Sequence, residues 1–145
     1  MKKIVVIGPE STGKSALCEQ LAAKFHTSWV PEYAREHLLK YGAAYTYSDL
    51  LTIAKQQIAL EDKISKETSS EIIFIDTDMY VMKVWGEFVF NRCHQWVLDT
   101  IVERQYDMYL LCNTDLEWVK DELREYPDPE TRRRLFYMYK DILVN

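Results

Sequence analysis

The feature that most constrains the fold is the stretch GPESTGKS at positions 8–15, which directly follows the apolar, β-branched run at positions 3–7. Glycine adopts backbone conformations closed to other residues, so Gly8 and Gly13 allow the loop between them to turn its N–H groups inward. A helix that starts after such a loop points the positive end of its dipole at the same centre. The stretch therefore predicts a strand, a loop that cradles an anion and a helix, in that order.

The spacing also matches G-x-x-x-x-G-K-[ST], the pattern of a loop that binds a nucleoside triphosphate. Lys14 is expected to reach the β- and γ-phosphates and to take part in catalysis, and Ser15 is expected to bind Mg²⁺. The cofactors implied are ATP and Mg²⁺. The residues expected to contact the nucleotide are Gly8, Glu10, Ser11, Thr12, Gly13, Lys14, Ser15 and Ala16.

Strand-like and helix-like segments alternate along the rest of the chain. Apolar runs predict strands at 3–7, 28–31, 72–75 and 108–112, and helical spacing predicts helices at 15–25, from 33, from 48, at 79–90, at 93–104 and from 128. Strands that are apolar on both faces are typical of a parallel sheet covered by helices. We therefore expect one α/β domain over residues 1–145.

Composition limits the partners. The formal net charge is -5, which disfavours nucleic acid and anionic membranes as partners. The apolar runs are shorter than a bilayer span, and the first one is too short for a secretory signal, so a cytoplasmic protein is expected. The three cysteines are expected to be reduced and packed, and the three histidines are too scattered to predict a metal site.

Charged residues follow two of the predicted strands. Asp76, at the end of the third strand, is a candidate Mg²⁺ ligand and catalytic residue. In Asp76-Thr77-Asp78 one carboxylate can cap the next helix while the other serves the nucleotide site. Glu32 follows the second strand and could orient or deprotonate an acceptor hydroxyl, or could simply favour a helix start. The candidate residues for binding the acceptor are Glu32, Tyr33, Arg35, Asp78 and Trp85.

An arginine-rich region, about 117–135, predicts a lid over the nucleotide. Arginines that close over a transferring phosphoryl group stabilise its charge and exclude water. Arg124 is the candidate with a catalytic role, and Arg132 and Arg133 are further lid candidates. Successive helical residues point about 100° apart, so only one or two of Arg132, Arg133 and Arg134 can face a common site.

Three classes of protein could use such a nucleotide-binding loop: a GTPase switch, a mechanical ATPase and a small-molecule kinase. A GTPase needs a guanine-selecting Asn-Lys-x-Asp motif after the fourth strand, and the segment found there, Asn113-Thr114-Asp115, has no lysine. A mechanical ATPase normally has a further subdomain, for which this sequence shows no region. A small-molecule kinase agrees best with the arginines and the acceptor candidates. The alternative is a regulatory ATPase or nucleotide sensor without a small acceptor.

Four elements together resemble the ribosylnicotinamide kinase domain of the NadR type and its stand-alone AAA-type relatives. The elements are the loop at 8–15, Glu32-Tyr33-Ala34-Arg35-Glu36, Asp76-Thr77-Asp78, and Trp118 with Asp121-Glu122-Leu123-Arg124. The resemblance implies a P-loop nucleoside-kinase-like sandwich of three layers. It also implies ATP- and Mg²⁺-dependent phosphorylation of nicotinamide riboside to nicotinamide mononucleotide, in NAD synthesis. Such relatives continue into a further strand, so the sheet here is expected to lack its last strand.

Overall fold

A parallel sheet of four strands lies at the centre of the computed structural model, which describes residues 1–9, 13–113 and 128–144. The order of the strands across the sheet is β2-β3-β1-β4. The strands are β1 (Lys2–Ile7), β2 (Trp29–Val30), β3 (Ile72–Asp76) and β4 (Met108–Leu111). The helices are α1 (Lys14–Lys24), α2 (Tyr33–Tyr41), α3 (Tyr47–Glu67), α4 (Met79–Phe90), α5 (Gln95–Glu103) and α6 (Pro129–Val144).

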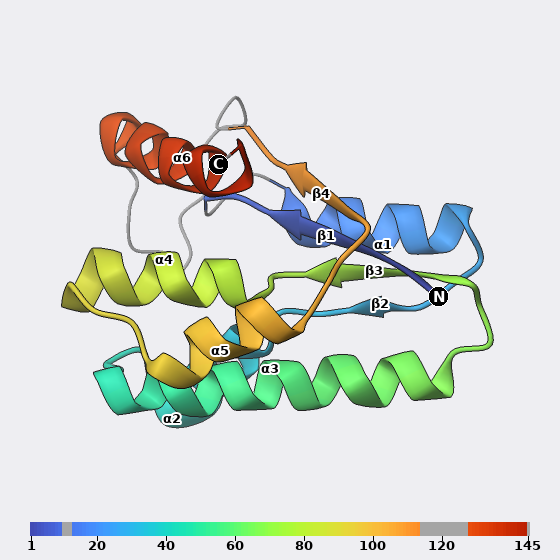
Figure 1. The fold of residues 1–145 in the computed structure, drawn as a ribbon, viewed down its shortest axis with the longest axis horizontal. Helices are drawn as coiled ribbons and strands as arrows, with labels where there is room; N and C mark the ends of the chain where they lie inside the picture. The colour runs from blue at the N-terminus through green and yellow to red at the C-terminus, as the bar shows by residue number, and fades with distance from the viewer. Residues whose placement is uncertain (10–12, 114–127, 145) are drawn as a thin grey trace.

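Both faces of the sheet are covered, because successive side chains of a strand point to opposite faces. In β1, Ile4 and Val6 pack with residues of α1, whereas Val5 and Ile7 pack with residues of α3, α4 and α6. The helices α2, α3, α4 and α5 share a second apolar cluster beyond the sheet. Figure 1 shows these layers, with α1 on one side and α3 and α4 on the other. The expected α/β sandwich with a parallel sheet is confirmed.

The carboxyl ends of the central strands meet at one edge of the sheet. Val6 pairs with Asp76, and Val30 of β2 pairs with Ile75, so β1, β2 and β3 end almost level. Because α1, α2 and α4 each follow one of these strands, the three helices begin at this edge, away from the N-terminus (Figure 1). Ligands of open parallel sheets bind at such an edge.

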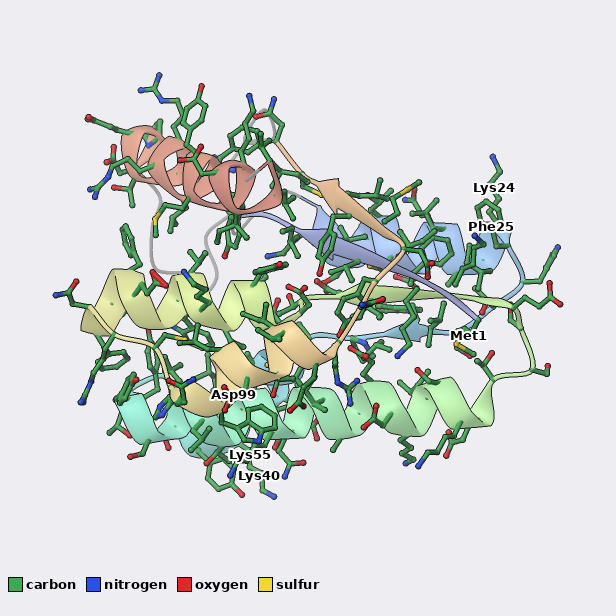
Figure 2. The ribbon with its side chains drawn as sticks, in the orientation of Figure 1. Met1, Lys24, Phe25, Lys40, Lys55 and Asp99 are labelled. Atoms are coloured by element: carbon green, nitrogen blue, oxygen red, sulfur yellow. The ribbon has the colours of Figure 1, made fainter. Side chains whose placement is uncertain are left out.

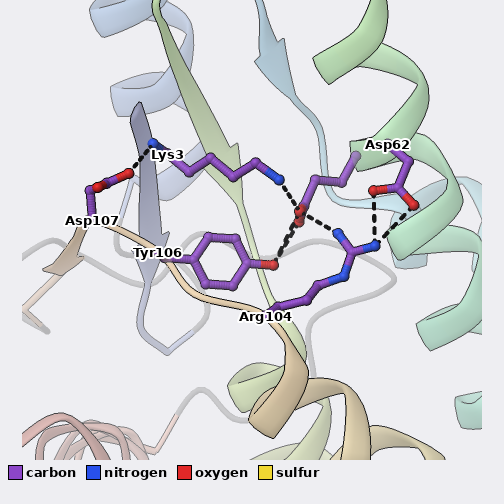
Figure 3. A network of polar contacts seen from close by, with 6 residues as sticks. Lys3, Asp62, Arg104, Tyr106 and Asp107 are labelled. Carbon is purple, nitrogen blue, oxygen red and sulfur yellow. Dashed lines mark hydrogen bonds and ion pairs between the residues drawn. The ribbon is translucent and has the colours of Figure 1, made fainter. Parts of the chain in front are cut away.

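A cluster of polar side chains around Glu61 connects the sheet with the helices (Figure 3). Glu61 of α3 is 1% exposed and accepts hydrogen bonds from Lys3 Nζ at 3.2 Å, Arg104 Nη1 at 2.8 Å and Tyr106 Oη at 2.9 Å. Arg104 also pairs with Asp62 at 2.9 Å. A buried carboxylate needs such partners. The cluster therefore ties α3 to β1 and to the segment between α5 and β4.

Candidate active site

The predicted phosphate loop begins and ends at two glycines whose backbones have positive φ. Gly8 has φ 147°, and a Cβ at this position would lie 2.9 Å from the carbonyl oxygen of Cys112, so only glycine fits against the end of β4. Gly13 has φ 80° and is the N-cap of α1, in the left-handed region that glycine adopts readily. Glu10, Ser11 and Thr12, also expected to contact the nucleotide, lie outside the described residues.

Lys14 and Ser15 occupy the first turn of α1, as the motif predicts. The Lys14 ammonium donates a 2.8 Å hydrogen bond to the carbonyl oxygen of Gly8, so the side chain folds back across the loop. The first turn of α1 contains no acidic residue, and an anion is favoured at such a helix start. The positive charge and the helix start therefore lie together at the carboxyl end of β1.

Asp76 joins this helix start to β3. Its side chain is fully buried, and its Oδ2 accepts a 2.5 Å hydrogen bond from the Ser15 hydroxyl. Burial raises the pKa of Asp76, and the nearby charge of Glu32 raises it further. A hydroxyl and a carboxylate at this distance are oxygen ligands of the kind that Mg²⁺ takes alongside phosphate oxygens and water. The two residues therefore fit the predicted metal site.

Glu32 lies beside Asp76, bridged to it by Thr77. The Thr77 hydroxyl lies 2.9 Å from Glu32 Oε2 and 3.3 Å from Asp76 Oδ1. Glu32 is half-buried at the N-cap of α2, and its side chain makes no capping hydrogen bond there. The Glu32 side chain therefore contacts Thr77 rather than the start of α2, and its action on an acceptor hydroxyl stays a prediction.

Asp78 bonds to other partners than Asp76 does. Its side chain is 2% exposed, its Oδ1 accepts from the Tyr80 N–H at 3.0 Å, and its Oδ2 accepts from the Tyr109 hydroxyl at 2.9 Å. Burial raises the pKa of Asp78 to about 7. Asp78 is therefore the capping carboxylate of the pair, since both of its oxygens are bonded within the fold.

The remaining acceptor candidates lie on helices that start at or near the same edge. Tyr33 is half-buried and Arg35 is exposed in the first turn of α2. Trp85, in the middle of α4, donates its indole N–H to the Tyr45 hydroxyl at 2.8 Å, and the two rings meet edge to face at 4.9 Å. Sequence reasoning did not include Tyr45, for which the sequence offers no signal beyond an aromatic side chain.

Gln57 is a site residue that sequence reasoning missed. It lies in α3, is 1% exposed and bonds to the backbone on both sides of Glu32. The available signal was a polar residue on the apolar face of a helix, since Ile53, Ala54 and Ile58 around it are buried. A polar side chain in such a position needs buried partners.

The lid candidates are only partly described. Arg124 lies outside the described residues. In the first turns of α6, Arg132 is 5% exposed, whereas Arg133 and Arg134 are exposed and the Arg134 guanidinium lies 5.6 Å from the centre of the Phe88 ring. The three arginines thus point in different directions, as their spacing predicts. Whether any of them closes over a nucleotide stays a prediction.

Other expectations concern metals, thiols and membranes. Within residues 1–9, 13–113 and 128–144, no three His, Cys, Asp or Glu side chains gather as a metal-binding group. Cys18, Cys93 and Cys112 form no disulfide with one another, and Cys18 is buried. None of the helices in the described part of the chain is both long and apolar enough to span a bilayer.

Comparison with known proteins identifies relatives that match most of this chain. The chain is 28% identical over 148 residues to the trifunctional NAD biosynthesis/regulator protein NadR of Escherichia coli, covering 99% of this chain and 35% of that protein. It is 30% identical over 128 residues to NadR of Salmonella typhimurium, covering 86% of this chain and 31% of that protein. The chain thus spans about a third of the length of these curated relatives.

Solved structures with the same fold include NadR and a deoxynucleoside kinase. NadR in complex with NR has a TM-score of 0.83 at 22% identity, covering 99% of this chain and 41% of that one. NadR with NAD and AMP-PNP has a TM-score of 0.78 at 21% identity, with the same coverage. Deoxyadenosine kinase from M. mycoides has a TM-score of 0.60 at 14% identity, covering 97% of this chain and 82% of that one. The fold is therefore that of P-loop nucleoside kinases.

A family model described as an AAA domain matches residues 3–145, nearly the entire chain. The match includes the phosphate loop, Glu32 and Asp76, and the similarity to NadR confirms the resemblance recognised from the motifs. The chain belongs to the AAA domain family, and over most of its length it is similar to NadR.

Proposed function

We propose that this protein transfers the γ-phosphoryl group of ATP to the 5′-hydroxyl of a small nucleoside, with nicotinamide riboside as the first candidate. The observation that carries the proposal is the series of close polar contacts from Ser15 through Asp76 and Thr77 to Glu32, in which the Thr77 hydroxyl lies between the two carboxylates. The series joins the start of the phosphate-binding helix to a carboxylate at the end of a neighbouring strand. A carboxylate so close to the phosphate site suits an enzyme that activates an acceptor.

Each end of the series has a distinct task. Gly8, Gly13, Lys14, Ser15 and Ala16 hold the phosphates, and Ser15 and Asp76 would hold Mg²⁺, which when bound neutralises charge on the phosphate oxygens. Glu32 faces the acceptor. The acceptor hydroxyl oxygen forms the new bond to the γ-phosphorus, the bond from phosphorus to the ADP oxygen breaks, and Glu32 takes the hydroxyl proton. The products are a nucleoside monophosphate and ADP.

Further residues complete the proposed sites. Tyr33, Arg35 and Trp85 would bind the nucleoside, while Asp78 supports them by capping α4. Glu10, Ser11 and Thr12 would add contacts to ATP. Arg124, Arg132 and Arg133 would form the lid and exclude water, which prevents loss of the phosphoryl group to hydrolysis.

The similarity to NadR favours a pyridine nucleoside over other acceptors. The relatives are named for NAD biosynthesis, and a NadR structure with the same fold contains NR. The deoxyadenosine kinase fold shows that this architecture also serves other nucleosides. Adenosine, deoxyadenosine, cytidine and uridine are therefore the comparison substrates.

The test is ADP release from ATP and Mg²⁺ with each nucleoside in turn, with the phosphorylated product identified by mass. We expect nicotinamide riboside to stimulate turnover most. Lys14→Ala should abolish the stimulated rate, whereas Lys24→Ala, at the exposed far end of the same helix (Figure 2), should not change it. Hydrolysis that no nucleoside accelerates would instead support a regulatory ATPase or nucleotide sensor.

A further inference from the structure

Gln57 bonds to the main chain on both sides of Glu32. Its Oε1 accepts the Tyr33 N–H at 2.8 Å, and its Nε2 donates to the Pro31 carbonyl oxygen at 3.1 Å. The amide is 1% exposed, so neither bond competes with water. Because Gln57 lies on the long helix α3, it anchors the backbone of Glu32 to a different element of the fold.

Thr77 holds the other end of Glu32, its carboxylate. The hydroxyl is 2.9 Å from Glu32 Oε2 and 3.3 Å from Asp76 Oδ1, and the residue is 2% exposed. One hydroxyl has one proton to donate, and the shorter distance is to Glu32. Without this donor, Glu32 would lose its hydrogen bond to Thr77 while the Asp76 charge still repels it, and the half-buried side chain could turn away.

The backbone of Thr77 is itself unusual. Its φ is 81°, in the left-handed region that a β-branched residue rarely adopts. The Thr77 N–H bonds to the carbonyl oxygen of Val6 at 3.2 Å, which keeps this conformation against β1. Strain of this kind persists where the surrounding structure imposes it, and it gathers at functional sites. Here the strained residue directs its hydroxyl between two site carboxylates.

We propose that Gln57 and Thr77 are positioning residues that fix Glu32 for proton acceptance, and we call the pair the Glu32 clamp. Neither residue touches the reacting atoms. The clamp rests on the proposed function, in which Glu32 meets the acceptor hydroxyl. Misplacing such a group by about 1 Å can cost about 100-fold in rate, so removing either contact is expected to lower kcat by about 10- to 100-fold.

The experiment compares four full-length variants in the ADP-release assay with nicotinamide riboside. Thr77→Val keeps the shape but lacks the hydroxyl, Gln57→Met lacks both amide bonds, and Thr77→Ser restores the hydroxyl. Thr27→Val is the matched control, since the Thr27 hydroxyl bonds to the Ile72 carbonyl oxygen at 2.5 Å at the opposite end of the sheet. If Thr77→Val does not fold, Thr77→Gly replaces it, because glycine accepts the left-handed backbone.

We expect Thr77→Val and Gln57→Met to lower kcat while the KM values for ATP and nucleoside change by less than about threefold. Thr77→Ser should retain most of kcat, and Thr27→Val should match the wild type. A wild-type kcat in both Thr77→Val and Gln57→Met would overturn the clamp. So would an equal loss in Thr77→Ser and Thr77→Val, because the hydroxyl would then not be the cause.

A second measurement separates failure of the clamp from failure of the proposed function. The Glu32 carboxyl carbon is observed by NMR in protein labelled with ¹³C-glutamate and is assigned with Glu32→Gln. If no nucleoside stimulates the wild type but the Glu32 signal moves in Thr77→Val and Gln57→Met and not in Thr27→Val, the clamp stands and the kinase proposal falls. A Glu32 signal unmoved in every variant refutes the clamp itself.

Discussion

Ser15 and Asp76 are 61 positions apart in the chain, and their side chains share a 2.5 Å hydrogen bond at the carboxyl edge of the sheet. Ser15 comes from the phosphate-binding motif and Asp76 from the end of β3. In our proposal Mg²⁺ takes one oxygen ligand from each of these two segments. The parallel pairing of β1 with β3 brings the two together, since Val6 is level with Asp76.

Asp76→Asn should remove most of the benefit that Mg²⁺ brings to ATP binding, because the neutral amide is a poorer ligand for a divalent cation. We expect nucleoside-stimulated turnover to fall by about 100- to 1,000-fold. ATP binding measured by calorimetry with Mg²⁺ and with EDTA checks this. Asp99→Asn is the control, since Asp99 is exposed on α5 (Figure 2). An unchanged Mg²⁺ dependence in Asp76→Asn would exclude Asp76 from the metal site.

Glu32→Gln should lower kcat by about 100- to 10,000-fold, because the amide accepts no proton from the acceptor hydroxyl. ATP affinity should stay close to that of the wild type, since Glu32 faces the acceptor in our proposal. Glu36→Gln, one turn further along α2 and exposed, is the matched control. Steady-state kinetics checks both variants, and equal kcat values for the two would rule out a catalytic role for Glu32.

Gly8→Ala should lower the free energy of unfolding by about 1–3 kcal/mol, because the new Cβ meets the Cys112 carbonyl oxygen at 2.9 Å in a strained backbone conformation. Gly42→Ala separates strain from crowding, since Gly42 has φ 95° but no atom within 4 Å of an added Cβ. Urea denaturation should show the larger loss for Gly8→Ala. Equal losses would show that the contact with Cys112 contributes nothing.

Glu61→Gln should destabilise the fold by about 1–3 kcal/mol without changing the KM for ATP, because it weakens the bonds from Lys3, Arg104 and Tyr106 at a buried position. Asp62→Asn should cost less than about 1 kcal/mol, since the Asp62 side chain is 44% exposed. Thermal denaturation and the ADP-release assay check both. A large effect of Glu61→Gln on kcat with no loss of stability would contradict a structural role.

Asp49, at the start of α3, should contribute to the free energy of unfolding in a pH-dependent way. Its side chain accepts the Thr46 N–H at 2.7 Å, which lowers the pKa of Asp49. A lowered carboxyl pKa means that the stabilisation is present above the unfolded-state pKa of about 4 and is lost as the pH falls below it. Wild type should therefore be more stable than Asp49→Asn at pH 7, and the difference should shrink toward pH 3. Urea denaturation at several pH values tests this, and a constant difference would contradict it.

Much of the fold could be predicted because the signals are local. The apolar runs and helical periods depend on neighbours within one element, so all four strands and the helices were located to within a few residues. The loop glycines were predictable for the same reason, since their backbone conformation is a property of the residue itself. The sequence predicted that one of Asp76 and Asp78 caps the next helix, but not which one, because both lie next to the end of the same strand.

By itself the sequence determined the order of strands and helices, the phosphate loop and the carboxylates that follow β2 and β3. Only the tertiary structure decided which carboxylate is turned toward Ser15, that Thr77 bridges to Glu32, and that Gln57 reaches the turn around Glu32 from α3. The physical reason is range: backbone preferences act between neighbours in the chain. A hydrogen bond between side chains distant in sequence depends on how helices pack across the sheet, which no single segment specifies.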